Sequence, residues 1–158
     1  SLPPSPHAPV LYVQGNPDAG YENRPPEGCI CIEDEIFTYR GVRILGLGGS
    51  MRYKPGPHQF SQWDMNLRVL KLRYKLWRAG GFDILLTHSP AFELNDGEDL
   101  PHTGFQAFRR LIDQYSPQYF IHGHVHSSYG GAYKRLSQCG RTTVINAYER
   151  YDFEYPDL

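Results

Sequence analysis

The C-terminal half of the chain contains the stretch YFIHGHVH (residues 119–126), in which a short apolar strand runs straight into a pair of histidines. In an extended segment alternate side chains point to the same side, so His124 and His126 can face one cleft. Gly123 lets the backbone approach a bound ion closely, because glycine has no Cβ. This spacing predicts a metal site, and the alternative is an ordinary pair of surface histidines on a hairpin.

Two other strand ends carry metal-competent side chains of the same kind. Asn16 follows the apolar residues 10–13, and His88 follows the apolar residues 82–86. Side chains at the ends of buried strands in α/β sheets converge on a cleft, because the chain leaves the core there. Imidazole nitrogens and amide oxygens suit manganese, iron, nickel or zinc better than calcium. The candidate metal ligands are therefore Asn16, His88, His124 and His126.

Around these strand ends the hydrophobic pattern predicts strands first and strand-helix-strand units afterwards. The predicted strands span residues 10–13, 29–32, 36–39, 42–47, 82–87, 119–121, 129–139 and 142–147, and the predicted helices span residues 61–78 and 103–115, with Thr103 as an N-cap. This order indicates one α/β layered domain with a mixed sheet, formed by residues 1–158.

The predicted helix at residues 61–78 carries two chemically distinct sets of side chains. The apolar set recurs at spacings of four and three, which makes one stripe of the kind that packs on a core. Its members are Trp63, Leu67, Leu70, Tyr74 and Trp77. The interleaved basic residues are Arg68, Lys71, Arg73, Lys75 and Arg78. A nucleic-acid-binding helix is one interpretation of the basic set, and a solvated helix face is the favoured one.

The charge balance of the whole chain argues against a polyanionic partner. Its 158 residues include 16 Lys and Arg against 17 Asp and Glu. We therefore expect no nucleic-acid footprint and no membrane association. Three cysteines are too few for a disulfide framework and predict a cytoplasmic protein. Cys29 and Cys31 are expected to be small buried hydrophobic residues on one face of a strand.

Three motifs together resemble those of a known family. GNPD (residues 15–18), LLTHSP (residues 85–90) and GHVH (residues 123–126) resemble, in the same order, the last three motifs of the calcineurin-like metallophosphoesterases. The resemblance implies a layered α/β sandwich with mixed sheets that hydrolyses phosphodiester or phosphomonoester bonds. It also implies two divalent metal ions, with manganese expected first and iron, nickel or zinc as alternatives, and a metal-bridging hydroxide as the nucleophile. In that arrangement Asn16, His88 and His124 hold one ion and His126 the other.

The chain departs from the family pattern in two ways. Pro17 stands where the family usually has a histidine beside the phosphate, and proline has no titratable group and no N–H donor. Arg52 and His122 are candidate substrate contacts, although a structural role is favoured for each. The family's first two motifs, Asp-x-His and Gly-Asp-x-x-Asp, do not occur in the 158 residues. We therefore expect the C-terminal two-thirds of such a domain, incomplete at its N-terminus, and homo-oligomers formed through an unpaired sheet edge.

Three alternatives to a phosphoesterase acting on a small phosphoester remain. Pro17 and the missing motifs favour a catalytically impaired fragment, or a protein-binding scaffold on the same fold. A mononuclear zinc module built from the histidines alone is a third interpretation, although the chain lacks the cysteine sets typical of structural zinc. The four candidate ligands favour the enzyme, because a scaffold does not need a metal-facing set.

Overall fold

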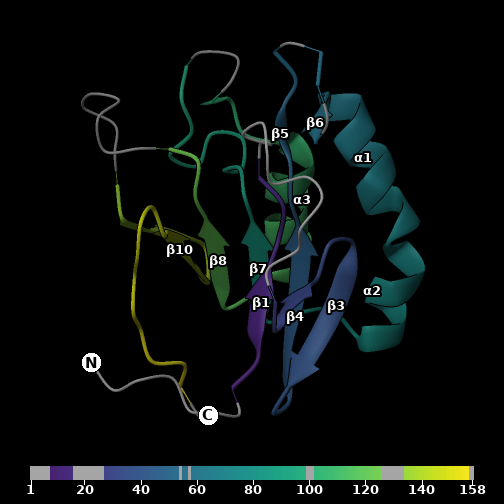
Figure 1. The fold of residues 1–158 in the computed structure, drawn as a ribbon, viewed down its shortest axis with the longest axis vertical. Helices are drawn as coiled ribbons and strands as arrows, with labels where there is room; N and C mark the ends of the chain where they lie inside the picture. The colour runs from purple at the N-terminus through teal and green to yellow at the C-terminus, as the bar shows by residue number, and fades with distance from the viewer. Residues whose placement is uncertain are drawn as a thin grey trace.

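A six-stranded mixed sheet forms the centre of the computed structural model (Figure 1). The structure describes residues 8–15, 27–53, 55–56, 58–98, 102–125 and 134–156. The strands, in their order across the sheet, are β3 (Glu35–Tyr39), β4 (Val42–Leu47), β7 (Ile84–Thr87), β8 (Tyr119–His122), β10 (Thr142–Asn146) and β9 (Leu136–Cys139). The inner four run parallel, and the two outer strands pair antiparallel with their neighbours. The predicted α/β class with a mixed sheet is confirmed.

One row of side chains crosses the four parallel strands and shows how the sequence builds the core. Leu45 pairs with Leu85, Leu85 with Phe120, and Phe120 with Val144. All four are essentially inaccessible to solvent. Parallel strands covered by helices need such apolar runs, and this explains why these strands could be predicted from the sequence.

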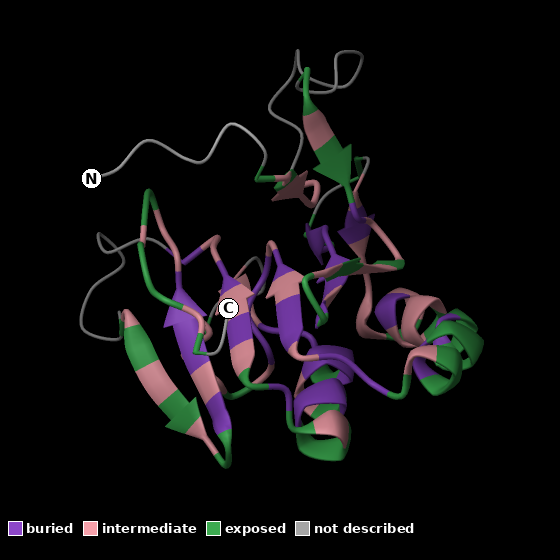
Figure 2. Cartoon of the chain, turned by 90° about the horizontal axis from the view of Figure 1, so that it is seen from below, coloured by how far each residue is buried: buried purple, intermediate pink, exposed green. Residues whose placement is uncertain are grey.

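Helix α3 (Gln106–Tyr115) covers this row with Phe108, Leu111 and Ile112, and Figure 2 shows its buried side turned to the sheet. The helix begins after Phe105, so the expected N-cap at Thr103 is wrong. Phe105 itself is fully buried with its ring packed against Phe108, and the Gln106 amide at the start of the helix donates to the side chain of Gln62 at 2.9 Å.

The predicted helix at residues 61–78 is two helices, α1 (Gln62–Lys71) and α2 (Arg73–Ala79), which meet at Leu72. A capping box between Ser61 and Asp64 starts α1. The stripe that begins at Trp63 was expected on the core side, and this expectation is wrong because all five of its side chains are exposed.

The core contact of α1 and α2 is instead made by a second apolar row, Met65, Leu72 and Leu76. The sequence therefore offers two apolar faces, and a partly buried charge selects between them. Arg68 lies on the inner side, where its guanidinium pairs with Glu33 and Asp34, at 2.8 Å in each case. This ion-pair cluster places the second row against the sheet and leaves the Trp63 stripe outside.

Two short parallel ladders complete the fold: β1 (Val10–Tyr12) with β2 (Cys29–Cys31), and β5 (Ser50–Met51) with β6 (Gln59–Phe60). The first strand was expected to be buried, and Val10 is 52% exposed. The two cysteines were also expected to be buried, but Cys29 is half-buried and Cys31 exposed. The reason is that β1 and β2 pair only with each other and lie outside the main sheet.

The hairpin of β9 and β10 turns at Gly140, as predicted, although residues 129–133 of its expected first strand lie outside the described part. No helix among the described residues is both long enough and apolar enough to span a bilayer.

Candidate metal centre

The ends of two neighbouring parallel strands bring His88 and His124 together. His88 follows β7, and His124 follows β8 by two residues. The His88 Nε2 and His124 Nδ1 atoms lie 3.0 Å apart, and the ring centroids are separated by 4.8 Å. The predicted convergence of these two histidines is thus observed. Asn16 and His126 lie outside the described residues, so metal binding by the set of four stays a prediction.

The backbone around His124 is not extended, so the expected alternation of the two histidines along a strand is wrong at this residue. His124 has φ +66°, and the Val125 amide donates to the Gly123 carbonyl at 2.8 Å, which closes a three-residue turn. Such a turn is rare for a residue with a side chain and persists only where the surroundings hold it.

Hydrogen bonds to both flanking strands hold this turn. The Gly123 amide donates to the His88 carbonyl at 3.0 Å, which ties the turn to the end of β7. On the other side the buried Asn146 amide group, at the end of β10, donates to the Val125 carbonyl at 2.9 Å. Asn146 therefore positions the His124 loop, a role that could not be predicted from the sequence because Asn146 lies outside every motif.

Gly15 explains why the GNPD motif begins with glycine. A Cβ at Gly15 would lie 2.8 Å from Cε1 and 2.9 Å from Nδ1 of His88, closer than side-chain atoms tolerate. The described chain thus reaches the His88 imidazole at the residue that precedes Asn16. The preceding residue, Gln14, is fixed by its carbonyl, which accepts a hydrogen bond from the Gly49 amide at 2.8 Å.

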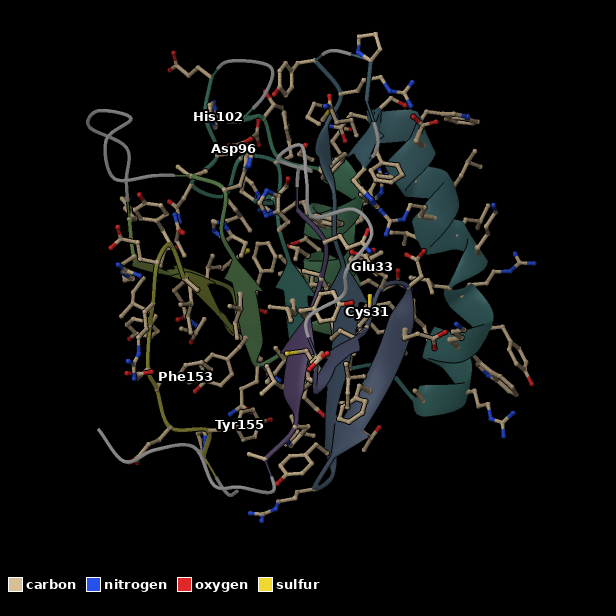
Figure 3. The ribbon with its side chains drawn as sticks, in the orientation of Figure 1. Cys31, Glu33, Asp96, His102, Phe153 and Tyr155 are labelled. Atoms are coloured by element: carbon tan, nitrogen blue, oxygen red, sulfur yellow. The ribbon has the colours of Figure 1, made fainter. Side chains whose placement is uncertain are left out.

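His102, at the end of the loop of residues 92–102, packs against His124. Its ring centroid lies 5.1 Å from that of His124. The loop that carries it is braced by Asp96, which accepts a hydrogen bond from the Gly104 amide at 2.8 Å. Figure 3 shows Asp96 and His102 at the end of the molecule toward which β7 and β8 point. The place of this loop in the sequence is an indication that it lies near the site, because the loop leaves the sheet directly after His88.

The structure gives His122 an enclosed position. The side chain is 1% exposed and stacks on Phe120 with ring centroids 5.2 Å apart. Its Nδ1 pairs with the Gly123 carbonyl at 3.0 Å, and its Nε2 has no hydrogen-bond partner among the described residues. Burial lowers the pKa of His122 to about 4, so the ring is neutral near pH 7.

Arg52, the other candidate for substrate contact, lies close to the start of α1. Its guanidinium pairs with Asp64 at 3.1 Å and donates to the Gln59 carbonyl. Contact of Arg52 with a substrate stays a prediction.

The nitrogen spacing of the histidine pair matches that of two ligands of one divalent ion. Two imidazole nitrogens bound to one ion at about 2.0–2.1 Å are about 2.9–3.4 Å apart for right-angle to tetrahedral geometry. The observed 3.0 Å falls in this interval. Without metal, one nitrogen donates a hydrogen bond to the other. The described residues contain no group of three or more His, Cys, Asp or Glu that could hold a metal, and two of the four predicted ligands lie outside them.

The family model of the calcineurin-like phosphoesterases matches residues 2–128. The chain belongs to this family. The matched region of this calcineurin-like phosphoesterase includes all four predicted ligand positions, and no curated protein matches the chain.

Solved structures share the fold of this calcineurin-like phosphoesterase. TT1561 of Thermus thermophilus matches with a TM-score of 0.58 and 19% identity over 90% of this chain and 64% of its own. Another solved structure matches with a TM-score of 0.59 and 18% identity over 88% of this chain and 57% of its own. The chain thus spans about three-fifths of the length of these two structures.

Proposed function

We propose that this chain carries out metal-dependent hydrolysis of phosphodiester bonds. The observation that carries the proposal is the pair of nitrogens from His88 and His124, 3.0 Å apart at the ends of neighbouring parallel strands. Family membership supports the reaction class, since these are phosphoesterases. The three free cysteines support a cytoplasmic setting.

In this proposal Asn16, His88 and His124 hold one divalent ion and His126 contributes to a second, with manganese as the first candidate. Divalent ions supply a bound water of lowered pKa and neutralise negative charge on the phosphoryl oxygens. The chain's own part is to hold the ligands in place. Gly123 and Asn146 fix the turn, and the turn holds His124 in one orientation, facing His88.

The chain's residues also bear on the substrate. Pro17 removes the family's usual histidine beside the phosphate, so a leaving group that needs no proton is favoured, such as an aryl oxide. The loop of Asp96 and His102 stands next to His124, and we assign it to the wall of the substrate site.

The second candidate function is a protein-binding scaffold on the same fold, and Pro17 is the observation that favours it. It predicts an unchanged fold with no metal-dependent turnover. The histidine pair argues for the enzyme, because two imidazole nitrogens in contact at a strand end serve no evident purpose in a scaffold.

Hydrolysis of bis(p-nitrophenyl) phosphate tests the proposal. The purified chain should release p-nitrophenolate when Mn²⁺ is added and stop when EDTA is added. His88→Ala and His124→Ala should each lose most of this activity. The matched control is His58→Asn, since His58 is a histidine outside the site whose φ of +53° asparagine tolerates. Unchanged turnover in His124→Ala would rule out the assignment, and a metal-loaded but inactive wild type would favour the scaffold.

A further inference from the structure

Half of the exposed large hydrophobic side chains in the described part of the chain lie on one face of α1 and α2. They are Trp63 (70% exposed), Leu67 (39%), Leu70 (55%), Tyr74 (61%) and Trp77 (76%). Their spacing of four, three, four and three residues puts them in one line along the helices. A continuous apolar line of this kind marks an interaction surface, whereas scattered apolar residues do not.

The core does not require this face, because Met65, Leu72 and Leu76 already bury the opposite side of the same helices. We call the line of five residues the Trp63–Trp77 face. Figure 1 shows α1 and α2 beside the β3 edge of the sheet, at the outside of the molecule. Figure 2 shows exposed residues on their outward side. At about 1.5 Å per residue the two helices are together roughly 27 Å long, so the exposed side chains form an extended strip.

The charges beside the Trp63–Trp77 face are mostly positive. Residues 62–79 contain five Lys and Arg and one Asp, in a chain whose formal net charge is −1. Lys75 forms an ion pair with Glu35, and Arg68 forms an ion pair with Glu33. The remaining basic side chains are Lys71, Arg73 and Arg78, all of them exposed and directed to solvent at the surface of the two helices. The face is thus apolar and cationic together.

The positive charge beside the Trp63–Trp77 face indicates which kind of partner binds there. In a symmetric dimer the same patch meets itself, so the cations of two copies would come close to one another. An anionic bilayer offers the opposite charge and a flat apolar layer at once. Trp63 lies at one end of the line and Tyr74 and Trp77 at the other, with leucines between them. Tryptophan and tyrosine favour the headgroup level of a membrane, and leucine favours the acyl boundary beneath it.

We propose that the Trp63–Trp77 face binds the surface of an anionic lipid bilayer, with α1 and α2 lying in the plane of the headgroups. The balanced charge of the whole chain gave no reason to expect this, because the excess of basic residues is local to one helix pair. Peripheral binding of this kind needs no membrane-spanning helix.

Tryptophan fluorescence tests the proposal directly, because the two tryptophans of the chain, Trp63 and Trp77, both lie on this face. Vesicles of phosphatidylglycerol and phosphatidylcholine should shift the emission to the blue, and brominated acyl chains should quench it. The chain should sediment with these vesicles and not with phosphatidylcholine alone. Added salt should release it.

Matched variants separate the face from the rest of the surface. Leu70→Glu should weaken vesicle binding about tenfold or more. Leu136→Glu replaces a side chain of similar exposure on β9 and should leave binding unchanged. Neutralising Lys71 and Arg78 with glutamine should weaken binding about fivefold per cation. Both leucines are exposed, so circular dichroism should show an intact fold in each variant.

Three outcomes would overturn the proposal. The first is emission and sedimentation that anionic vesicles do not change. The second is equal binding to neutral vesicles, which would remove the charge argument. The third is a blue shift that grows with protein concentration without lipid, together with a dimer in sedimentation velocity, which would make a second copy of the chain the occupant.

Discussion

Burial of His122 predicts that acid destabilises the protein by a defined amount. The ring is enclosed against Phe120, and this burial lowers its pKa to about 4, against an ordinary value of 6.5. The Gly123 carbonyl opposes the shift, and the charge of His124 adds to it. Below pH 6.5 the unfolded chain is protonated at this residue, whereas the folded chain becomes protonated there only near pH 4. Stability is therefore fully present above the unfolded pKa and is lost as the pH falls.

The size of the effect follows from the shift. At about 1.4 kcal/mol per pKa unit, the full loss is about 3 kcal/mol, and about 2 kcal/mol of it occurs between about pH 7.5 and about pH 5. His122→Phe supplies the reference, because phenylalanine keeps a flat ring beside Phe120 and does not titrate. Urea unfolding of both proteins in EDTA at the two pH values gives four free energies. The difference between wild type and variant isolates His122, since every other residue is the same in the two proteins.

The wild type should lose about 2 kcal/mol more than His122→Phe between about pH 7.5 and about pH 5. Equal losses in the two proteins would refute the reasoning, because they would mean that the folded state accepts the proton on His122 without penalty. An NMR titration of the His122 ring gives an independent reading of its pKa.

Three further changes have expected outcomes of their own. Gly104→Ala should destabilise the fold by at least about 2 kcal/mol in urea unfolding, because the new Cβ would lie 2.2 Å from the carbonyl carbon of Ala91. Phe108→Ala should lower the free energy of unfolding by about 3–5 kcal/mol, since the ring is fully buried, and a change below about 1 kcal/mol would contradict that packing. Asn146→Ala removes the donor to the Val125 carbonyl and should weaken Mn²⁺ binding about 10–100-fold in a calorimetric titration, whereas unchanged affinity would show that the turn holds without it.

The parallel strands were predictable because each is a run of apolar residues that must be buried on both faces. The same logic failed for α1 and α2, where two apolar rows compete for the core. Arg68 decides between them through its ion pairs with Glu33 and Asp34. These partners lie more than thirty residues away in the chain, and no local pattern contains them.

The metal site, too, could be predicted from the sequence only in part. The approach of His88 to His124 followed from the rule that side chains at the ends of neighbouring parallel strands meet. The turn at His124 did not follow from any local pattern, because its support comes from Asn146 on a strand that the motifs do not reach. The position of His102 beside His124 could not be predicted either, since it depends on the path of a loop.

Metal binding by the histidine pair is the central claim, and equilibrium dialysis with elemental analysis tests it most directly. The apo chain is dialysed against Mn²⁺ and, separately, Zn²⁺, alongside His88→Ala, His124→Ala and the control His58→Asn. The structure predicts bound metal in the wild type and the control, and little or none in the two site variants at the same free metal concentration. Equal metal content in the wild type and both site variants would contradict the assignment of the 3.0 Å His88–His124 pair as the metal-binding core.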